Sequence, residues 1–365
     1  MAQIGKYLLI GSSEPFSGKS TTILGLSHQL QQKGIDIAFG KPLVINSELI
    51  RTGVEQDVNF ISDSLNLPAN RIAATILGLD ETIVQKRLLG EITVDYQQSL
   101  RQKYLESSWG DLFLIEGAEN LEEGSLFGLS VSQIAEAIDG KVLLVNRYKS
   151  TLSAEQIILA KQKLGDRLVG VVINDISQDQ VNNVDEMLVP YLEAEGIPVL
   201  GVLPKTKLLR CISVHELVNN LEAQVLCSAN SLDFMVESMA IGAMNVNSAV
   251  KYFRKRRNMA VVTGGDRVDI QQAALESSAQ CLILTGKLPP ASFILSRAEE
   301  LEVPILSVDL DTLTTVEIID KTFRQAKVHE PVKVQCIQSL MAEHFDVNRL
   351  LSLIGLIDTP RPPLG

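Results

Sequence analysis

Short apolar runs alternate with longer amphipathic segments along the first 205 residues. The runs begin at residues 6, 36, 111, 141, 168 and 198 and read KYLLIG, DIAFGKP, DLFLIEGA, KVLLVN, LVGVVIND and PVLGVLP. Segments with helical spacing, such as SAEQIILAKQKLG, separate them. Continuous apolar strands between helices are typical of a parallel sheet that is buried on both faces. The pattern predicts an α/β fold with helices on both faces of a parallel sheet.

A second alternating region begins near Ser213. AQVLCSA, MAVVTGG, AQCLILTG and VPILSVD are strand-like, and the segments between them have helical spacing. The last apolar pattern, VKVQCIQSLMAEHFDVNRLLSLIGL, predicts two helices that close this second, smaller α/β domain. TPRPPLG predicts a disordered tail. We therefore expect domains at residues 1–208 and 209–355, followed by a tail at 356–365.

The first apolar run leads into GSSEPFSGKS, and a helical pattern follows from Ser20. Strand, turn and helix are the setting of a phosphate-binding loop, in which Lys19 would reach the phosphates and Ser20 would contact Mg²⁺. The amino end of the helix would also favour an anion. Six residues separate Gly11 from Gly18 where the usual motif has four, so the first half of the turn is non-standard. The alternative is a Ser/Gly turn that ends in GKS by chance.

Polar residues follow several of the predicted strands. Ligands of such sheets bind at the carboxyl ends of the strands, where Lys41, Glu116 and Lys149 are expected to lie. Glu116 follows four apolar residues and would hold Mg²⁺ or its water shell. Taken singly, Glu116 could be a solvated strand end and Lys41 a surface lysine before a turn. Together with Lys19 they predict an anion-binding rim around a carboxylate that can bind a metal.

Composition excludes several classes of function. A formal net charge of -11 argues against a nucleic-acid-binding protein, which needs a basic face. The four cysteines are far apart and form no CxxC pair, which favours reduced thiols over a disulfide framework or a zinc site. No apolar stretch has the length of a membrane span or a signal peptide. We expect a cytoplasmic protein without nucleic-acid or membrane partners.

GKST, GKPL around Lys41, LIEGA around Glu116 and GVVIND resemble, in this order, the dethiobiotin synthetase-like P-loop family. The resemblance is closest to the branch that forms the amino-terminal region of long phosphotransacetylases, and it covers about the first 205 residues. It implies ATP and Mg²⁺ as ligands. The implied nucleotide contacts are Ser13, Glu14, Ser17, Gly18, Lys19, Ser20, Thr21 and, for adenine, Asn174; the implied metal ligands are Ser20, Asp57 and Glu116.

The chemistry of the synthetase is less well matched than its nucleotide site. In that family the lysine matching Lys41 serves a carbamate intermediate, and here Lys149 would assist it. EGAEN replaces the family's EGAGG, and residues 54–98 show no substrate signature. The phosphate side of the resemblance is therefore stronger than the substrate side.

VVTGGDRVDIQQAAL and its surroundings, from about Cys211 to Ala326, resemble the DRTGG domain. Gly264, Gly265, Asp266 and Arg267 lie between a strand and a helix, so we expect a ligand or a subunit interface there. A tight turn without a ligand is the alternative. The resemblance implies a regulatory or oligomerising role.

Two functions remain open. The first, which we favour, is a nucleotide-responsive module that forms a homo-oligomer and acts on a partner, such as a metabolic enzyme. The second is an ATP-dependent ligase of the dethiobiotin synthetase type. Long phosphotransacetylases continue into a catalytic domain, whereas this sequence stops at Gly365, so we expect no acetyl transfer by this chain alone.

Overall fold

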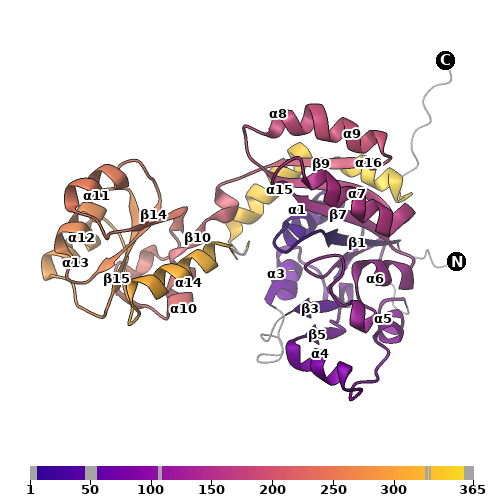
Figure 1. Cartoon of the computed structure of the whole chain (residues 1–365), viewed down its shortest axis with the longest axis horizontal. Helices are drawn as coiled ribbons and strands as arrows, with labels where there is room; N and C mark the ends of the chain where they lie inside the picture. The colour runs from indigo at the N-terminus through magenta and orange to yellow at the C-terminus, as the bar shows by residue number, and fades with distance from the viewer. Residues whose placement is uncertain (1–5, 46–55, 106–108, 325–327, 329, 357–365) are drawn as a thin grey trace. The chain divides into compact units, whose positions relative to one another are not determined.

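The computed structural model describes residues 6–45, 56–105, 109–324, 328 and 330–356, and the side chains of residues 56, 57 and 324 lie outside this description (Figure 1). The chain divides into two compact units. Unit 1 comprises Met1–Lys205 together with His329–Gly365, and unit 2 comprises Thr206–Val328. The predicted tail falls almost entirely on residues 357–365, which are outside the described residues.

A seven-stranded sheet forms the centre of unit 1, and all of its neighbouring strands are parallel. Its order is β4 (Ile72–Ala73), β2 (Ile37–Gly40), β6 (Leu112–Glu116), β1 (Lys6–Ser12), β7 (Lys141–Arg147), β8 (Leu168–Ile176) and β9 (Val199–Pro204). Leu8, Leu9 and Ile10 are all fully buried. Because successive side chains of a strand point to opposite faces, both faces of the sheet are covered, as the sequence predicts.

Unit 1 also contains helices, several of which cover this sheet. They are α1 (Lys19–Gln32), α3 (Gln56–Ser64), α4 (Glu81–Leu88), α5 (Tyr96–Leu105), α6 (Val131–Ala137), α7 (Ser153–Leu164), α8 (Val181–Asn183), α9 (Val189–Ala194), α15 (Pro331–His344) and α16 (Val347–Leu353). Leu9 shares one core with Ile134 of α6 and Ile157 of α7. Helix α1 packs on β1, β2 and β6. Strands β3 (Leu43–Ile45) and β5 (Leu77–Leu79) form a separate parallel pair.

The last two helices belong to unit 1, so the prediction that they close the second domain is wrong. Helix α15 packs against α1, where a Cβ on Gly25 would lie 2.2 Å from Cγ of Met341. Arg349 of α16 donates to both carboxylate oxygens of Glu193 at 2.7 Å. The apolar face of α15 therefore covers the helix that follows the candidate phosphate loop.

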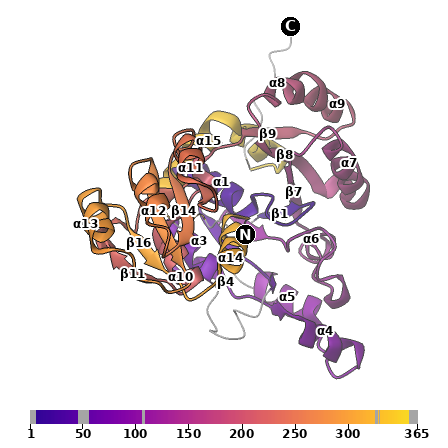
Figure 2. The ribbon, with the colours of Figure 1, turned by 60° about the vertical axis from the view of Figure 1, so that its left-hand side comes forward.

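Unit 2 contains the second α/β sheet that the sequence predicts (Figures 1 and 2). Its order is β11 (Gln224–Cys227), β16 (Ile305–Ser307), β15 (Ala279–Thr285), β14 (Met259–Gly264) and β13 (Ser238–Ile241), and only β11 is antiparallel to its neighbour. β10 (Ile212–Ser213) pairs with β12 (Met235–Val236).

Alternate residues of β14 belong to different cores. Val261 shares one core with residues of α11 (Val246–Phe253), α12 (Val268–Leu275) and α13 (Ser292–Glu300). Val262 shares the other with residues of α10 (Val214–Leu221) and α14 (Thr312–Arg324). Helices therefore cover both faces of this sheet as well. In the described part of the chain, no helix combines the length and the apolar character needed to cross a bilayer.

Candidate phosphate-binding site

The loop between β1 and α1 has the backbone geometry of an anion site. Gly18, which precedes α1, has φ 99°, a left-handed conformation that glycine adopts without strain. A Cβ at this position would lie 2.2 Å from Nδ2 of Asn174, so a larger residue would displace the Asn174 amide. No described side chain caps the amino end of α1. Its first N–H groups can therefore bind an anion.

Lys19 lies at the base of this loop and is 8% exposed. Its Nζ donates to Oγ of Ser12 at 2.9 Å, and Ser12 donates in turn to the carbonyl oxygen of Glu119 at 2.8 Å. Burial lowers the pKa of Lys19, and the nearby charge of Glu116 acts in the opposite direction. The site thus holds a desolvated ammonium group, whose attraction for a phosphate would be screened little by water.

Glu116 ends β6 and is 3% exposed. Ser20 donates to its Oε1 at 3.1 Å, and Nζ of Lys41 lies 3.7 Å from the same oxygen. The other oxygen, Oε2, is buried and has no hydrogen-bond partner among the described residues. A buried carboxylate oxygen without a partner is costly, so it suits a ligand that supplies a positive charge or a donor.

A Mg²⁺ ion fits this arrangement. The Ser20 hydroxyl and the unpartnered oxygen of Glu116 are hard oxygen donors, which Mg²⁺ prefers. Within the described ranges, no group of three or more His, Cys, Asp or Glu residues could hold a metal. A bound phosphate or water would complete the oxygen ligands of such an ion. The third predicted ligand, Asp57, is the second residue of α3, and its side chain lies outside the description.

The remaining predicted residues surround the loop from β7 and β8. Lys149 forms an ion pair with Glu14. Asn146, which the sequence reasoning missed, donates to Oγ of Ser13 at 2.9 Å. Asn174 donates from Nδ2 to the carbonyl oxygen of Ser17 at 2.8 Å, so it supports the loop directly.

Other residues of this rim make local contacts. Ser17 donates to the carbonyl oxygen of Glu14. Arg147 pairs with Asp175 at 2.8 Å. Thr21 is half-buried on α1. Around this loop of unit 1, Lys41 therefore lies next to Glu116, and Lys149 pairs with Glu14 of the loop itself.

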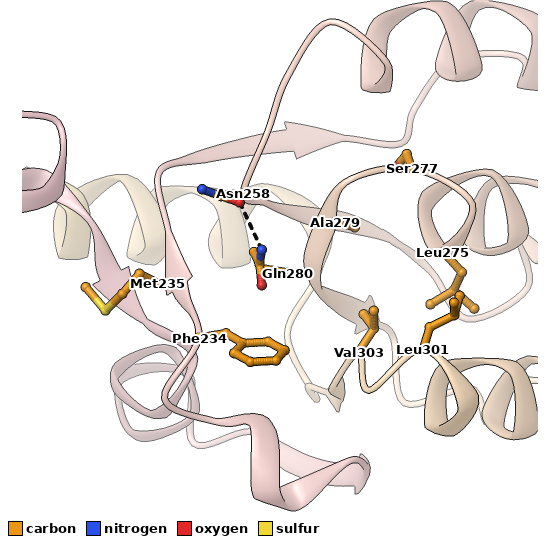
Figure 3. A pocket seen from close by; sticks show the side chains of 9 residues that line it. All are labelled: Phe234, Met235, Asn258, Leu275, Ser277, Ala279, Gln280, Leu301 and Val303. Carbon is orange, nitrogen blue, oxygen red and sulfur yellow. Dashed lines mark hydrogen bonds between the residues drawn. The ribbon is translucent and has the colours of Figure 1, made fainter.

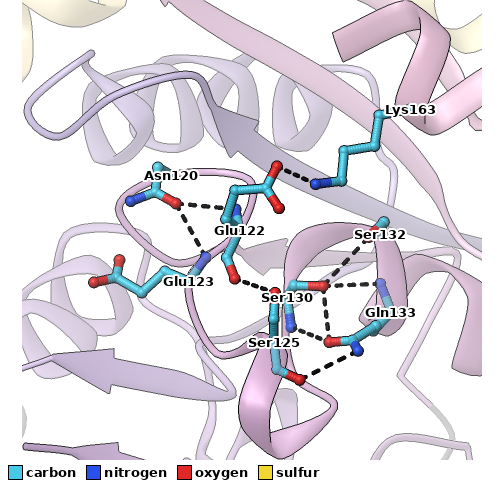
Figure 4. A network of polar contacts seen from close by, with 8 residues as sticks. All are labelled: Asn120, Glu122, Glu123, Ser125, Ser130, Ser132, Gln133 and Lys163. Carbon is cyan, nitrogen blue, oxygen red and sulfur yellow. Dashed lines mark hydrogen bonds and ion pairs between the residues drawn. The ribbon is translucent and has the colours of Figure 1, made fainter. Parts of the chain in front are cut away.

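The loop after β6 carries acids that sequence reasoning did not assign to the site (Figure 4). Asn120 accepts from the backbone N–H groups of Glu122 and Glu123 at 2.9 and 3.0 Å, which folds the loop back. Glu123 then accepts from the N–H of Glu119 at 3.0 Å. Burial and the charge of Glu119 raise the pKa of Glu123. The last two residues of EGAEN thus shape the charge near Lys19: Glu119 acts on it directly, and Asn120 holds the backbone of Glu123, whose charge also acts on Lys19.

In unit 2, the Gly264–Gly265 pair forms a tight turn at the end of β14. Gln271, fully buried and also missed from sequence, donates from Nε2 to the carbonyl oxygens of both glycines at 3.1 and 3.0 Å. A Cβ on Gly265 would lie 2.2 Å from the carbonyl oxygen of Leu288. Arg267 donates to the carbonyl oxygen of Met244 at 2.9 Å. Close backbone approach therefore explains the second glycine.

The side chains of Asp266 and Arg267 lie beside this turn. Asp266 faces Gly264, because its Oδ1 lies 2.5 Å from the position that a Cβ on this glycine would take. Arg267 also pairs with Asp269 at 3.3 Å. The four residues singled out from sequence are therefore adjacent at the carboxyl end of β14.

Two protein families match successive parts of the chain. The AAA domain family matches residues 6–212, and the DRTGG domain matches residues 216–322. Phosphate acetyltransferase of Synechocystis sp. is 24% identical over 374 residues, which cover 96% of this chain and 52% of the relative. The ATP-dependent dethiobiotin synthetase BioD of Bacillus licheniformis is 22% identical over 215 residues, which cover 56% of this chain and 87% of the relative.

The chain spans about half the length of the phosphate acetyltransferases that it matches. Among solved structures, the chain is 17% identical to the CBS and DRTGG domains of the regulatory region of Clostridium perfringens pyrophosphatase. The match covers 53% of this chain and 83% of that structure. Its TM-score of 0.28 is too low to support an inference about function. The first match covers more than half of the 365 residues. The chain therefore belongs to the AAA domain family, with a dethiobiotin synthetase-like P-loop domain followed by a DRTGG domain, as in the amino-terminal part of phosphate acetyltransferases.

Proposed function

We propose that this chain is a nucleotide-responsive binding module that takes ATP with Mg²⁺ in unit 1. The observation that carries the proposal is Glu116, whose Oε2 is buried without a described partner beside Ser20 and close to the Lys19 charge. A stable apolar sheet does not need such a group. A bound metal or its water would satisfy this oxygen.

Each group around the loop has a distinct role in this proposal. The free N–H groups at the start of α1 and the Lys19 ammonium would bind the phosphates. Ser20 and Glu116 would hold Mg²⁺, which would neutralise part of the phosphate charge. Asn174 already donates to the loop from its nitrogen, so its amide oxygen would accept from the amino group of adenine.

The basic residues favour binding over ligase chemistry. A carboxylating ligase would direct Lys41 and Lys149 at an acyl phosphate or carbamate. Here Lys41 lies 3.7 Å from Glu116, and Lys149 pairs with Glu14. These partners hold the two ammonium groups at the rim without a substrate. The ligase reading remains the second candidate, because both lysines do lie at the phosphate loop.

Unit 2 supplies the response in this proposal. Its Gly264–Gly265 turn and Arg267 lie at the carboxyl ends of parallel strands, where ligands of α/β sheets bind. We assign to this unit the assembly of a homo-oligomer or the sensing of a metabolite. The output would be the activity of a partner, such as a metabolic enzyme.

Turnover measurements separate the two candidate functions. A binding module with ATP and Mg²⁺ should release ADP far below the ~1 s⁻¹ that marks the slow end of typical enzymes. The Lys19→Ala variant, prepared identically, reports any contaminating ATPase. ADP release that depends on bicarbonate and a small amine, and that disappears in Lys19→Ala, would contradict the module and support the ligase.

A further inference from the structure

A cavity of about 470 Å³ opens in unit 2, away from the Gly264–Gly265 turn (Figure 3). Asn258 directly precedes β14, Gln280 is the second residue of β15, and Val303 lies just before β16. The cavity is therefore at the amino ends of the parallel strands, whereas Gly264 and Gly265 are at their carboxyl ends. Its volume is within the range of small-molecule sites.

The lining residues carry no charge, and apolar side chains share the walls with the polar groups of Asn258, Ser277 and Gln280. Leu275, Ala279 and Val303 are buried at 3%, 7% and 8% exposure, and the ring of Phe234 is half-buried on the opposite side. None of the residues that line the cavity is acidic or basic. An uncharged body with both apolar and polar surface fits these walls, whereas a phosphate would find no counter-charge there.

A chain of three side chains fixes the polar edge of the cavity. Glu237 accepts from Nδ2 of Asn258 at 2.7 Å, and Oδ1 of Asn258 accepts from Nε2 of Gln280 at 2.9 Å. A carboxylate only accepts, so it sets the orientation of the first amide, and the first amide sets that of the second. Gln280 therefore turns its nitrogen toward Asn258 and its oxygen to the side of Phe234 (Figure 3).

We propose that this cavity binds a neutral planar heterocycle that carries an N–H donor, such as the base of a nucleoside. The base would stack on the ring of Phe234 and donate to Oε1 of Gln280. Aromatic side chains accept any base face, and a few placed polar groups give orientation. Charged substituents of such a ligand would remain outside the cavity, in solvent.

The ligand side of this proposal can be tested on the wild-type chain. Adenosine, guanosine, cytidine and uridine are titrated by calorimetry, and the tightest binder is compared with its analogue in which methyl groups replace the base N–H hydrogens. We expect saturable binding below about 10 mM and at least about tenfold weaker binding of the methylated analogue. No binding by all four nucleosides, or equal binding of the analogue, overturns the proposal.

Variants locate the binding in unit 2. Phe234→Ala should weaken nucleoside binding about tenfold, since loss of a stacking ring has an effect of this size. Phe293→Ala removes an equal side chain that is 54% exposed and does not line the cavity, so it is the matched control. Unchanged nucleoside binding in a folded Phe234→Ala variant overturns the proposal.

The amide chain provides a second test if Phe234→Ala does not fold. Glu237 is exposed and lies outside the cavity, so Glu237→Gln leaves the walls intact. A glutamine at this position can donate, which permits both amides to turn over and present N–H to the ligand. We expect the discrimination against the methylated nucleoside to fall at least severalfold. Unchanged discrimination in the folded variant contradicts the role assigned to Gln280.

Discussion

At the scale of single residues, Lys19 combines deep burial with a charge that phosphate binding requires. Burial lowers its pKa below the ordinary 10.5, and a bound phosphate would raise it again. At an alkaline pH between these two values, ATP binding should therefore take up a proton. Calorimetry in two buffers of different ionisation enthalpy measures this uptake. Lys19→Arg, which stays charged, should show none; equal uptake by both proteins would contradict the assignment.

Glu123 predicts a pH-dependent effect on stability. Its pKa is raised in the folded chain by burial and by Glu119, so the folded state binds the proton more tightly than the unfolded state does. As pH rises from the ordinary 4.5 through the raised value, ionisation of Glu123 destabilises the fold. Glu123→Gln should be more stable than wild type at neutral pH.

The advantage of Glu123→Gln should vanish below pH 4.5, where the carboxyl group is protonated in both states. Urea unfolding at neutral and acidic pH measures the difference. Glu122→Gln is the matched control, because Glu122 lies next in the same loop but faces outward to Lys163. A destabilised Glu123→Gln at neutral pH would show that the charge is needed there.

Much of the site follows from sequence, because parallel strands deliver their carboxyl ends to one edge. That rule places Lys41, Glu116 and Lys149 near Lys19 without any structure. The contact of Lys19 with Ser12 and the nearness of Glu119 depend on the path of two loops. Local sequence patterns do not determine such paths, since loop conformation is set by the surrounding packing.

At the scale of elements, the contact between α1 and α15 depends on Gly25. A Cβ there would lie 2.2 Å from Cγ and 2.7 Å from Cβ of Met341, so α15 would have to move. Overpacking of this kind usually costs about 1–3 kcal/mol, which exceeds the gain in helix propensity of about 1 kcal/mol. We expect Gly25→Ala to destabilise unit 1.

A double-mutant cycle isolates this contact. Met341→Ala alone should cost about 2–5 kcal/mol, as truncations of buried methionine do. In the double variant the alanine at position 341 makes room for the new methyl group. The double variant should therefore lose less unfolding free energy than the two single variants lose together. Urea unfolding of the four proteins gives the coupling free energy. Strict additivity would contradict the close packing of α15 on α1.

The strands were predictable and the position of the last helices was not. Buried parallel strands are continuous apolar runs, which the sequence displays directly. The amphipathic pattern of Val332–Leu356 shows that these helices bury a face, but not which surface they cover. Nearness in sequence to unit 2 suggested the wrong surface; the small Gly25 and the carboxylate of Glu193 on unit 1 supply the right one.

At the scale of the whole molecule, the chain leaves unit 1 after Lys205 and returns to it at His329, so unit 2 is an insertion into the sequence of unit 1. The return ends on α15, which packs on the helix of the phosphate loop. This connection gives a covalent route by which unit 2 could be coupled to the phosphate loop of unit 1. We predict that a change in unit 2 alters the nucleotide response while ATP binding persists.

Gly265→Val tests that coupling. The new side chain would strike the carbonyl oxygen of Leu288, which a Cβ would approach to 2.2 Å. ATP affinity should stay within about threefold of wild type, whereas oligomer mass, or its change on adding ATP, should differ. Light scattering with and without ATP measures the oligomer mass and its change. Leu313→Ala, at a position 68% exposed on α14, is the control. A folded Gly265→Val with wild-type mass and response would remove the regulatory role of the turn.

The most direct test of the account is calorimetric titration of the full chain and its Lys19→Ala variant with ATP and Mg²⁺. The buried ammonium makes a charge-assisted contact of about 1.5–3 kcal/mol in the proposed complex, so ATP affinity should fall at least about tenfold in the variant while its unfolding transition persists. Unchanged ATP affinity in a folded Lys19→Ala variant, or no ATP binding by the wild-type chain, would contradict the assignment of this loop as a nucleotide site.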